Sequence, residues 1–408
     1  MNRKPRMPVM FLPTQLTTNG TQQMATMTTN RPFFMALGFL GMLALAGSVQ
    51  AESPGVIGQL TVEPSQLVMT HPRRGHSVVV TARTPLGRTV DLTAEATFGS
   101  SDPGVVRVSP LGWIEAVSNG TARIQVQANG LLGVVQVEVK LPAAVPRHSF
   151  RDDVMPVLSK TGCNQGACHG YSLGKNGFKL SLRGADPKAD FDSLTDEFLG
   201  RRINRHNPSA SLFLTKPLGE VAHKGGVRLE ADSLEHRLLF GWVREGAKAD
   251  SPGAAPFESL SIYPRRVVIG PGWQQQLQVI ATYSDGSRRD VTRLSVFTVN
   301  TERIAAVTRD GLVQASMLGE TAVSARFERT FATAEFLVLE PREDFEPTPV
   351  PTDNVVDRFV IQKLNSMNVR PSALVDDAGF LRRVSIDMTG IQPEPDQLQA
   401  FLADKDPK

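Results

Sequence analysis

The sequence predicts a multidomain protein in which two all-β sandwiches flank a mainly α block, followed by part of an α-helical domain. Three observations predict this fold class. A long segment made of short runs of alternating apolar and polar residues occurs twice, with an offset of 199 to 200 residues. Helical spacing of apolar residues appears between the two copies, and again after the second copy. The 408 residues are enough for two to four domains.

Composition and charge exclude several classes of protein. A hydrophobic content of 41% indicates a folded chain that is neither disordered nor an integral membrane protein. The 44 basic and 41 acidic residues give a net charge of +3 without a long run of one sign, so we expect no nucleic-acid partner. The only two cysteines lie close together, which excludes a small disulfide-stapled scaffold.

The N-terminal segment has the pattern of an export signal. Four basic residues precede the apolar run FFMALGFLGMLALAG: Arg3, Lys4, Arg6 and Arg31. After the run, Val49-Gln50-Ala51 provides small residues at the two positions that matter for cleavage. The apolar run is shorter than the roughly 20 residues that span a bilayer. We therefore expect residues 1–51 to be a cleaved signal peptide, with the mature chain in the periplasm or at the cell surface and without a transmembrane segment.

An internal repeat determines the architecture. The segment LTVEPSQLV from Leu60 recurs as LSIYPRRVV from Leu260, and the stretch from Asp91 matches the stretch from Asp290. Each copy consists of short alternating runs separated by turn residues such as Asp285-Gly286, which is typical of a β-sandwich.

The repeat resembles the group 2 bacterial immunoglobulin-like domain. The second copy has its early proline, the Asp-Val-Thr from Asp290, the Gly-Leu-Val from Gly311 and the Gly-x-Thr from Gly319. The first copy differs at Leu92 and at Gly112-Trp113-Ile114. The resemblance implies immunoglobulin-like sandwiches at 57–140 and 258–341. Such domains space, present or adhere, and they would contact cell wall, polysaccharide or protein rather than carry a catalytic set.

The block between the sandwiches, 148–247, contains the residues best suited to chemistry. After a short helical pattern from Ser149 comes CNQGACHG, which begins at Cys163. Covalent haem attachment requires two thiols for the two vinyl groups and an adjacent imidazole for the iron, and Cys163, Cys168 and His169 provide all three. Four residues separate the cysteines instead of the usual two. A Cys163–Cys168 disulfide and a zinc site with distant histidines remain alternatives.

A haem iron at His169 requires a second axial ligand on the other side. Since the chain has no methionine between Met155 and Met317, a histidine is expected to take that place. His223 is the first choice because the glycines that follow it allow close approach of the backbone. His206 is the second choice. His236 is the third, since its helical pattern places it on a solvated surface.

The block also resembles the haem-binding modules of planctomycete cell-surface proteins, which have a cytochrome c-like fold. The shared features are the helix entering CNQGACHG, GKNGFKLSLRGADP from Gly174, NPSASL from Asn207, HKGG from His223 and WVREGA from Trp242. The resemblance implies that Cys163, Cys168 and His169 bind haem c.

The last segment has helical patterns after a proline-rich linker at 342–353. Asp353 or Asn354 is expected to cap a first helix, a second helix surrounds FLRRVSIDMTG from Phe380, and a third begins near Pro395. These helices resemble the start of the domain of unknown function 1549. About 55 residues are too few for a stable domain of that kind, so we expect 354–408 to be a truncated part of it.

Taken together, these features predict an exported cell-envelope protein that binds covalent haem for electron transfer with an unidentified redox partner. The immunoglobulin-like domains would present the haem module. One alternative is a non-redox adhesion or interaction protein in which Cys163 and Cys168 form a disulfide. Another is the N-terminal part of an uncharacterised enzyme, although no catalytic constellation is evident in this chain.

Overall fold

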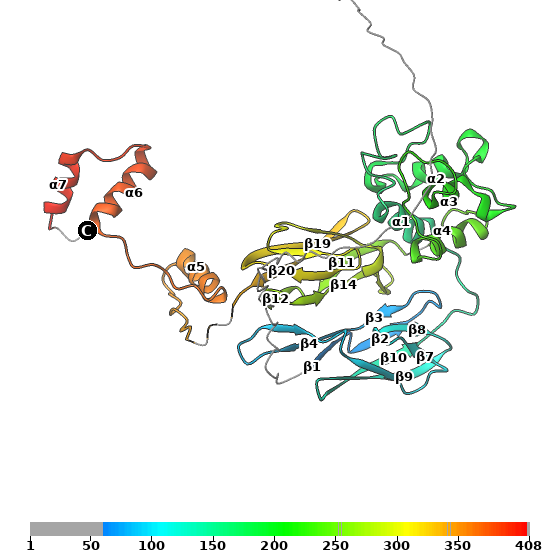
Figure 1. Cartoon of the computed structure of the whole chain (residues 1–408), viewed down its shortest axis with the longest axis horizontal. Helices are drawn as coiled ribbons and strands as arrows, with labels where there is room; N and C mark the ends of the chain where they lie inside the picture. The colour runs from blue at the N-terminus through cyan, green and yellow to red at the C-terminus, as the bar shows by residue number, and fades with distance from the viewer. Residues whose placement is uncertain (1–59, 252, 254, 341, 343, 406–408) are drawn as a thin grey trace, which may run out of the picture. The chain divides into compact units, whose positions relative to one another are not determined.

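The computed structural model of the chain describes residues 60–251, 253, 255–340, 342 and 344–405. The predicted signal peptide at 1–51 lies outside the described residues. Within the described part, every helix is too short or too polar to cross a membrane. The fold is multidomain, with sandwich-like β-sheets in two repeats and a few helices (Figure 1).

The first repeat forms three antiparallel or mixed sheets around one apolar core. Long strands alternate buried and exposed residues, so that Ala122, Ile124 and Val126 point inward from one strand. The strands are β1 (Leu60–Glu63), β2 (Gln66–Met69), β3 (His76–Ser77), β4 (Val79–Arg83), β5 (Thr89–Asp91), β6 (Thr97–Ser100), β7 (Val106–Val108), β8 (Trp113–Ala116), β9 (Gly120–Ala128) and β10 (Leu131–Val139). The sheet orders are β1-β4-β5, β2-β10-β9-β6 and β3-β8-β7.

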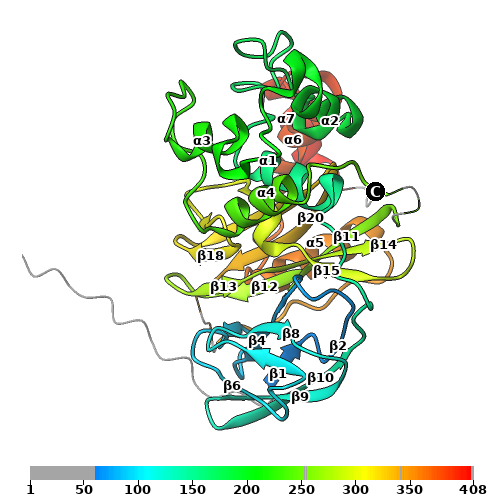
Figure 2. The same cartoon turned by 90° about the vertical axis from the view of Figure 1, so that its right-hand side faces the viewer.

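The second repeat has the same strand order. Its strands are β11 (Phe257–Tyr263), β12 (Arg266–Ile269), β13 (Gln274–Gln276), β14 (Gln278–Tyr283), β15 (Arg288–Asp290), β16 (Val296–Val299), β17 (Ala305–Val307), β18 (Leu312–Ala315), β19 (Gly319–Phe327) and β20 (Thr330–Val338). The corresponding sheets are β11-β14-β15, β12-β20-β19-β16 and β13-β18-β17. Figure 2 shows β11, β14 and β15 together in one of these sheets.

The hairpin predicted at Asp285-Gly286 is confirmed. It joins β14 to β15, and Gly286 has a φ of 78°, a left-handed conformation that glycine adopts without strain. The Asp285 carboxylate accepts a hydrogen bond from the Ser287 backbone N–H at 2.9 Å, which closes the turn.

A block of short helices separates the repeats in the sequence. The Ser149 hydroxyl accepts a hydrogen bond from the Asp152 N–H and caps the first turn. Pro156 is tolerated because it lies in the first turn of its helix. The helical elements are η1 (Phe150–Val154), α1 (Met155–Lys160), η2 (Leu182–Gly184), α2 (Pro187–Thr195), η3 (Glu197–Gly200), η4 (Pro208–Ala210), α3 (Leu212–Leu218) and α4 (Leu234–Arg244).

Aromatic side chains form the centre of this helical block. Trp242 of α4 is 1% exposed, and its ring lies 5.3 Å from that of Phe150. Phe150 in turn contacts Phe191 of α2 edge to face at 5.2 Å. Because these rings come from three separate elements, their burial fixes η1, α2 and α4 around one core.

Polar contacts join the repeats to each other and to the helical block. The carboxylate of Asp290 accepts hydrogen bonds from the backbone N–H and hydroxyl of Ser77, while the carboxylate of Asp91 accepts one from the Gln276 N–H. Asp91 and Asp290 occupy matching positions of the two repeats, so the contact is reciprocal.

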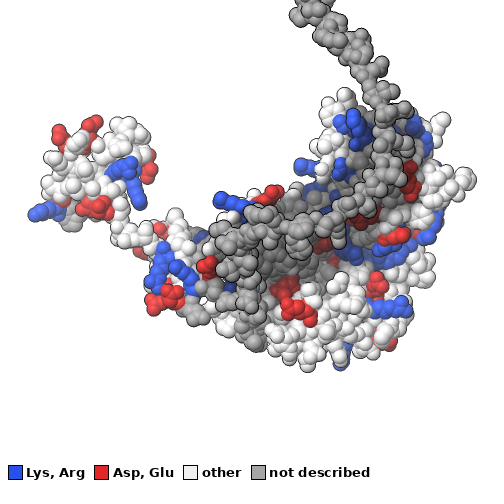
Figure 3. Space-filling view, in the orientation of Figure 1, with Lys and Arg blue, Asp and Glu red and all other residues white. Residues whose placement is uncertain are grey.

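Charged side chains of both signs are interspersed on the face drawn in Figure 3.

Three helices follow the second repeat: α5 (Val355–Ser366), α6 (Asp377–Thr389) and α7 (Pro395–Ala403). Asn354 caps α5 as predicted, since its side chain accepts hydrogen bonds from the N–H groups of Val356 and Asp357. The rings of Phe380 and Phe401 stack at 6.2 Å between α6 and α7. None of these helices contains a buried residue.

Candidate functional site

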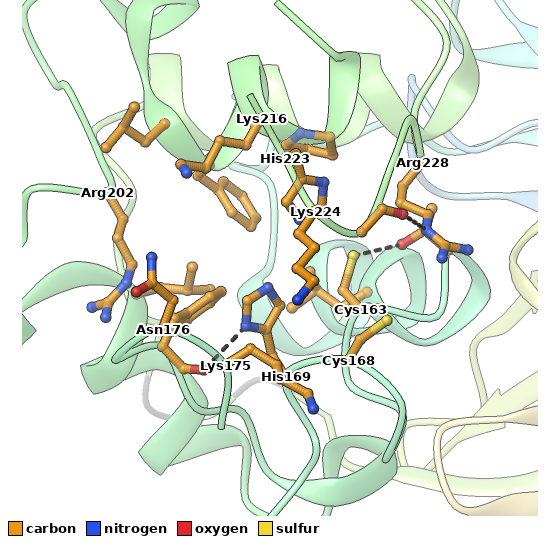
Figure 4. Close-up of a pocket in the computed structure, with 18 of the residues that line it drawn as sticks. Cys163, Cys168, His169, Lys175, Asn176, Arg202, Lys216, His223, Lys224 and Arg228 are labelled. Atoms are coloured by element: carbon orange, nitrogen blue, oxygen red, sulfur yellow. Dashed lines mark hydrogen bonds between the residues drawn. The ribbon is translucent and has the colours of Figure 1, made fainter. Parts of the chain in front are cut away.

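A cavity of about 860 Å³ in the helical block brings the predicted site residues together. Cys163, Cys168, His169 and His223 all line it (Figure 4). The first three come from the loop after α1, and His223 comes from the loop after α3. Buried or half-buried apolar side chains form part of its lining: Leu158, Leu194, Leu212, Phe213, Leu229 and Leu239.

Backbone hydrogen bonds hold the loop Cys163–Gly170 in a closed turn. The His169 N–H donates to the Cys163 carbonyl at 2.9 Å, which accommodates the four intervening residues as a bulge. Gly170 is required by close packing, because a Cβ at this position would lie 2.1 Å from the carbonyl oxygen of Asn164. These contacts therefore fix the loop that carries both thiols and the imidazole.

Both cysteines are free, half-buried thiols. The Sγ of Cys163 lies 3.2 Å from the hydroxyl oxygen of Thr161. Burial raises the pKa of Cys163, so this thiol stays protonated at neutral pH. Because the two thiols flank one side of the cavity, they can react with groups at the edge of a ligand bound there.

His169 is oriented by a backbone partner. Its Nδ1 lies 3.0 Å from the Phe178 carbonyl oxygen, so Nδ1 carries the proton and donates, and Nε2 retains a free lone pair. Burial lowers the pKa of His169 below 6.5, opposed by this hydrogen bond and assisted by the positive charges of Arg202 and Lys216. The imidazole is therefore neutral at neutral pH, which is the form that binds a metal.

His223 has the same arrangement on the other loop. Its Nδ1 lies 2.8 Å from the Gly226 carbonyl oxygen, which again leaves Nε2 free. The ring centroids of His169 and His223 are 6.4 Å apart, and the ring planes differ by 8°. Two imidazoles on opposite sides of one metal ion, with metal–nitrogen bonds of about 2 Å, have centroids about 6 Å apart. The observed separation is close to this value, so both histidines could hold one metal ion.

The other predicted histidines lie away from the cavity. His206 is exposed and its backbone N–H donates to Asn204. His236 of α4 accepts a hydrogen bond from the Asp232 N–H and contacts Phe240. In the part of the chain that the structure describes, no group of three or more His, Cys, Asp or Glu side chains could hold a metal ion, so the zinc alternative finds no ligand set there.

Sequence reasoning missed the positive charge around this cavity. Arg202 is 8% exposed, donates to the carbonyls of Ser193 and Gly177, and lies over the Phe178 ring. The lining contains no carboxylate among the described residues. Its cationic residues are Lys175, Arg201, Arg202, Lys216, Lys224 and Arg228.

Two parts of the chain match known families. Residues 256–335 match the model described as bacterial Ig-like domain (group 2), and residues 355–408 match PSCyt2, described as a protein of unknown function (DUF1549). These matches confirm the Ig-like resemblance for the second repeat and the resemblance of the last segment, and they define a multidomain protein that contains an Ig-like domain. Neither match includes the helical block, so its resemblance to cytochrome c modules and the planctomycete origin stay predictions. No curated protein matches the chain.

Solved structures with some likeness to the chain come from surface and adhesion proteins. The S-layer protein rSbsC(31-844) has 11% identity and a TM-score of 0.19, and the alignment covers 71% of this chain and 28% of that one. Domains 5-6 of SbsC have 10% identity and a TM-score of 0.27, covering 69% and 98%. Human Protocadherin-24 EC1-2 has 9% identity and a TM-score of 0.16, covering 70% and 100%. Such low TM-scores carry no argument about function.

Proposed function

We propose that the chain is a modular surface protein in which Ig-like sandwiches present the helical block. The observation that carries this proposal is the group 2 Ig-like match in a chain whose second repeat has the same strand order as the first. The predicted export signal adds support. The sandwiches would act as spacers and contact surfaces, and this function would need no redox chemistry.

Surface labelling tests the location of the protein. Intact cells that produce the full chain are treated with a membrane-impermeant biotin reagent, which modifies exposed lysines such as Lys188. Labelling before cell lysis supports a surface position, and labelling only after lysis contradicts it. Binding of the purified chain to insoluble cell wall is then compared with its binding to purified polysaccharide. This comparison identifies the material that the protein contacts.

We propose as a second function that the cavity holds covalent haem for electron transfer. The specific observation in its favour is the pair of parallel imidazoles, each with Nδ1 bonded to a backbone carbonyl and Nε2 free. Cys163 and Cys168 would bond the haem edge, and His169 and His223 would bind its iron. When bound, haem would supply a one-electron redox couple.

The fit rests on several independent properties of the cavity. Much of its lining is apolar, the size suits a large cofactor, and both thiols line it together with His169. The low pKa of His169 keeps the imidazole neutral. Two histidine ligands set a lower reduction potential than a histidine and a methionine.

A pyridine haemochrome spectrum tests the haem proposal. The full chain is produced with a haem-attachment system, and Cys163→Ser, Cys168→Ser and the double variant are prepared alongside. Covalent haem in the wild type that is lost in the double variant supports the proposal. A colourless wild type with a mass two hydrogens below that of the reduced chain supports the disulfide alternative instead and overturns electron transfer.

A further inference from the structure

The charge of the cavity lining shows which class of ligand it favours. Six cationic side chains line the cavity, and no Asp or Glu of the described residues does. Three of the six are engaged in the fold: Arg202 donates to backbone carbonyls, the Nε of Arg228 donates to the Gly225 carbonyl at 2.8 Å, and the Nζ of Lys175 lies over the Tyr171 ring. The remaining charge is available to a ligand.

Lys216 and Lys224 are the cations best placed to meet a ligand. Lys216 belongs to α3 and is half-buried, and its Nζ makes only a long 3.4 Å contact with the Ala222 carbonyl. Lys224 follows His223 directly, and among the described residues it has no ion-pair partner within 4.0 Å. Figure 4 shows both side chains beside His223 at the cavity.

Cations beside an apolar hollow favour an amphiphilic anion. The buried lining residues Leu158, Leu194 and Leu239 offer no hydrogen bonds to a small hydrated anion, so this part of the cavity disfavours one. A large planar apolar body would fill this part, while negative groups at its edge would meet the lysines.

We propose that Lys216 and Lys224 bind the carboxylates of a tetrapyrrole, so that the cavity selects a dianionic porphyrin over a neutral one. This inference rests on the proposed haem site and extends it, because it assigns recognition to charge as well as to the thiols and imidazoles. It also predicts that recognition does not require iron.

Binding of an iron-free porphyrin to the full chain tests the inference. The chain is produced without a haem-attachment system and titrated with deuteroporphyrin IX and with its dimethyl ester, using quenching of tryptophan fluorescence. A hydrogen bond to a charged group corresponds to about tenfold in affinity. We expect the ester to bind at least about tenfold more weakly than the diacid.

Lysine variants separate charge from shape. Lys216→Gln and Lys224→Gln are each expected to weaken diacid binding by about tenfold and to leave ester binding unchanged. Lys188→Gln is the matched control, because Lys188 pairs with Asp192 outside the cavity lining. Equal affinity for diacid and ester, or no effect of the cavity lysines, would overturn the inference.

A second measurement uses the protein with haem attached and does not depend on folding of the free chain. Loss of a positive charge near the iron favours the ferric state, so both cavity variants should have a lower midpoint potential than the Lys188→Gln control. An unchanged potential in both variants contradicts the inference. Lysine-dependent porphyrin binding in a chain that never acquires haem would instead refute electron transfer and leave this inference standing.

Discussion

A buried ion pair connects the helical block to the second sandwich. Asp153 lies in η1 and Arg289 in β15, and the Arg289 Nη2 donates to the Asp153 Oδ1 at 2.8 Å. Both side chains are 6% exposed, and Arg74 of the first repeat lies 3.6 Å from the same oxygen. Asp153→Asn removes the negative charge and leaves the buried Arg289 guanidinium without its carboxylate partner. Breaking a buried pair in this way costs about 3 to 5 kcal/mol.

The pKa of Asp153 gives a second measure of the same interaction. Burial alone would raise this pKa, but the guanidinium groups of Arg289 and Arg74 outweigh burial and hold it at about 2, against an ordinary value of 3.8. At about 1.4 kcal/mol for each pKa unit, the charged form contributes about 2 to 3 kcal/mol. Because the folded-state pKa is the lower one, this stability is present above about pH 4 and is lost as the pH falls towards 2.

Urea unfolding followed by tryptophan fluorescence measures the effect. Trp113, Trp242 and Trp273 lie in the first repeat, the helical block and the second repeat, so the signal reports on all three. We expect Asp153→Asn to lower the free energy of unfolding by about 2 to 5 kcal/mol at pH 7, and by less at pH 3. The control Asp192→Asn removes a solvent-exposed pair and should lower stability much less in the same titration. A loss below about 1 kcal/mol for Asp153→Asn, or a loss independent of pH, would refute the reasoning.

Two further substitutions test the packing around the candidate site. Gly170→Ala places a Cβ 2.1 Å from the Asn164 carbonyl and should destabilise the chain by about 1 to 3 kcal/mol, whereas Gly99→Ala meets no atom within 4 Å and should cost less in the same urea titration. Leu214→Ala empties a position that is 0% exposed and should cost about 2 to 5 kcal/mol, while Leu199→Ala, at a fully exposed position, should change stability by less than about 0.5 kcal/mol. Equal effects within either pair would contradict the assigned packing.

Local patterns in the sequence predicted much of the fold. The hairpin at Asp285-Gly286 and the cap at Asn354 depend on residues only a few positions apart, so the sequence contains the full cause of each structure. The repeat could be recognised because both copies place apolar residues at the same alternating positions. The helical block was harder to predict, since long loops with many glycine and proline residues join its short helices.

The candidate site was predicted only in part. Cys163, Cys168 and His169 are neighbours in the sequence, and His223 was selected because glycines follow it, so the sequence signalled all four. The cationic lining depends on how α3 and the loop after it fold over the cavity, and single lysines carry no such signal. The Asp153–Arg289 pair joins residues 136 positions apart and could not be inferred from either local pattern.

The proposal that His169 and His223 would both hold a haem iron is tested most directly by electron paramagnetic resonance of the ferric protein produced with a haem-attachment system. The wild type should give a low-spin signal, and His223→Ala should convert it to high spin because one axial ligand is lost. His206→Ala, at an exposed position outside the cavity lining, should leave the low-spin signal unchanged. A low-spin signal that survives in His223→Ala, or a wild type that is already high-spin, would contradict the account.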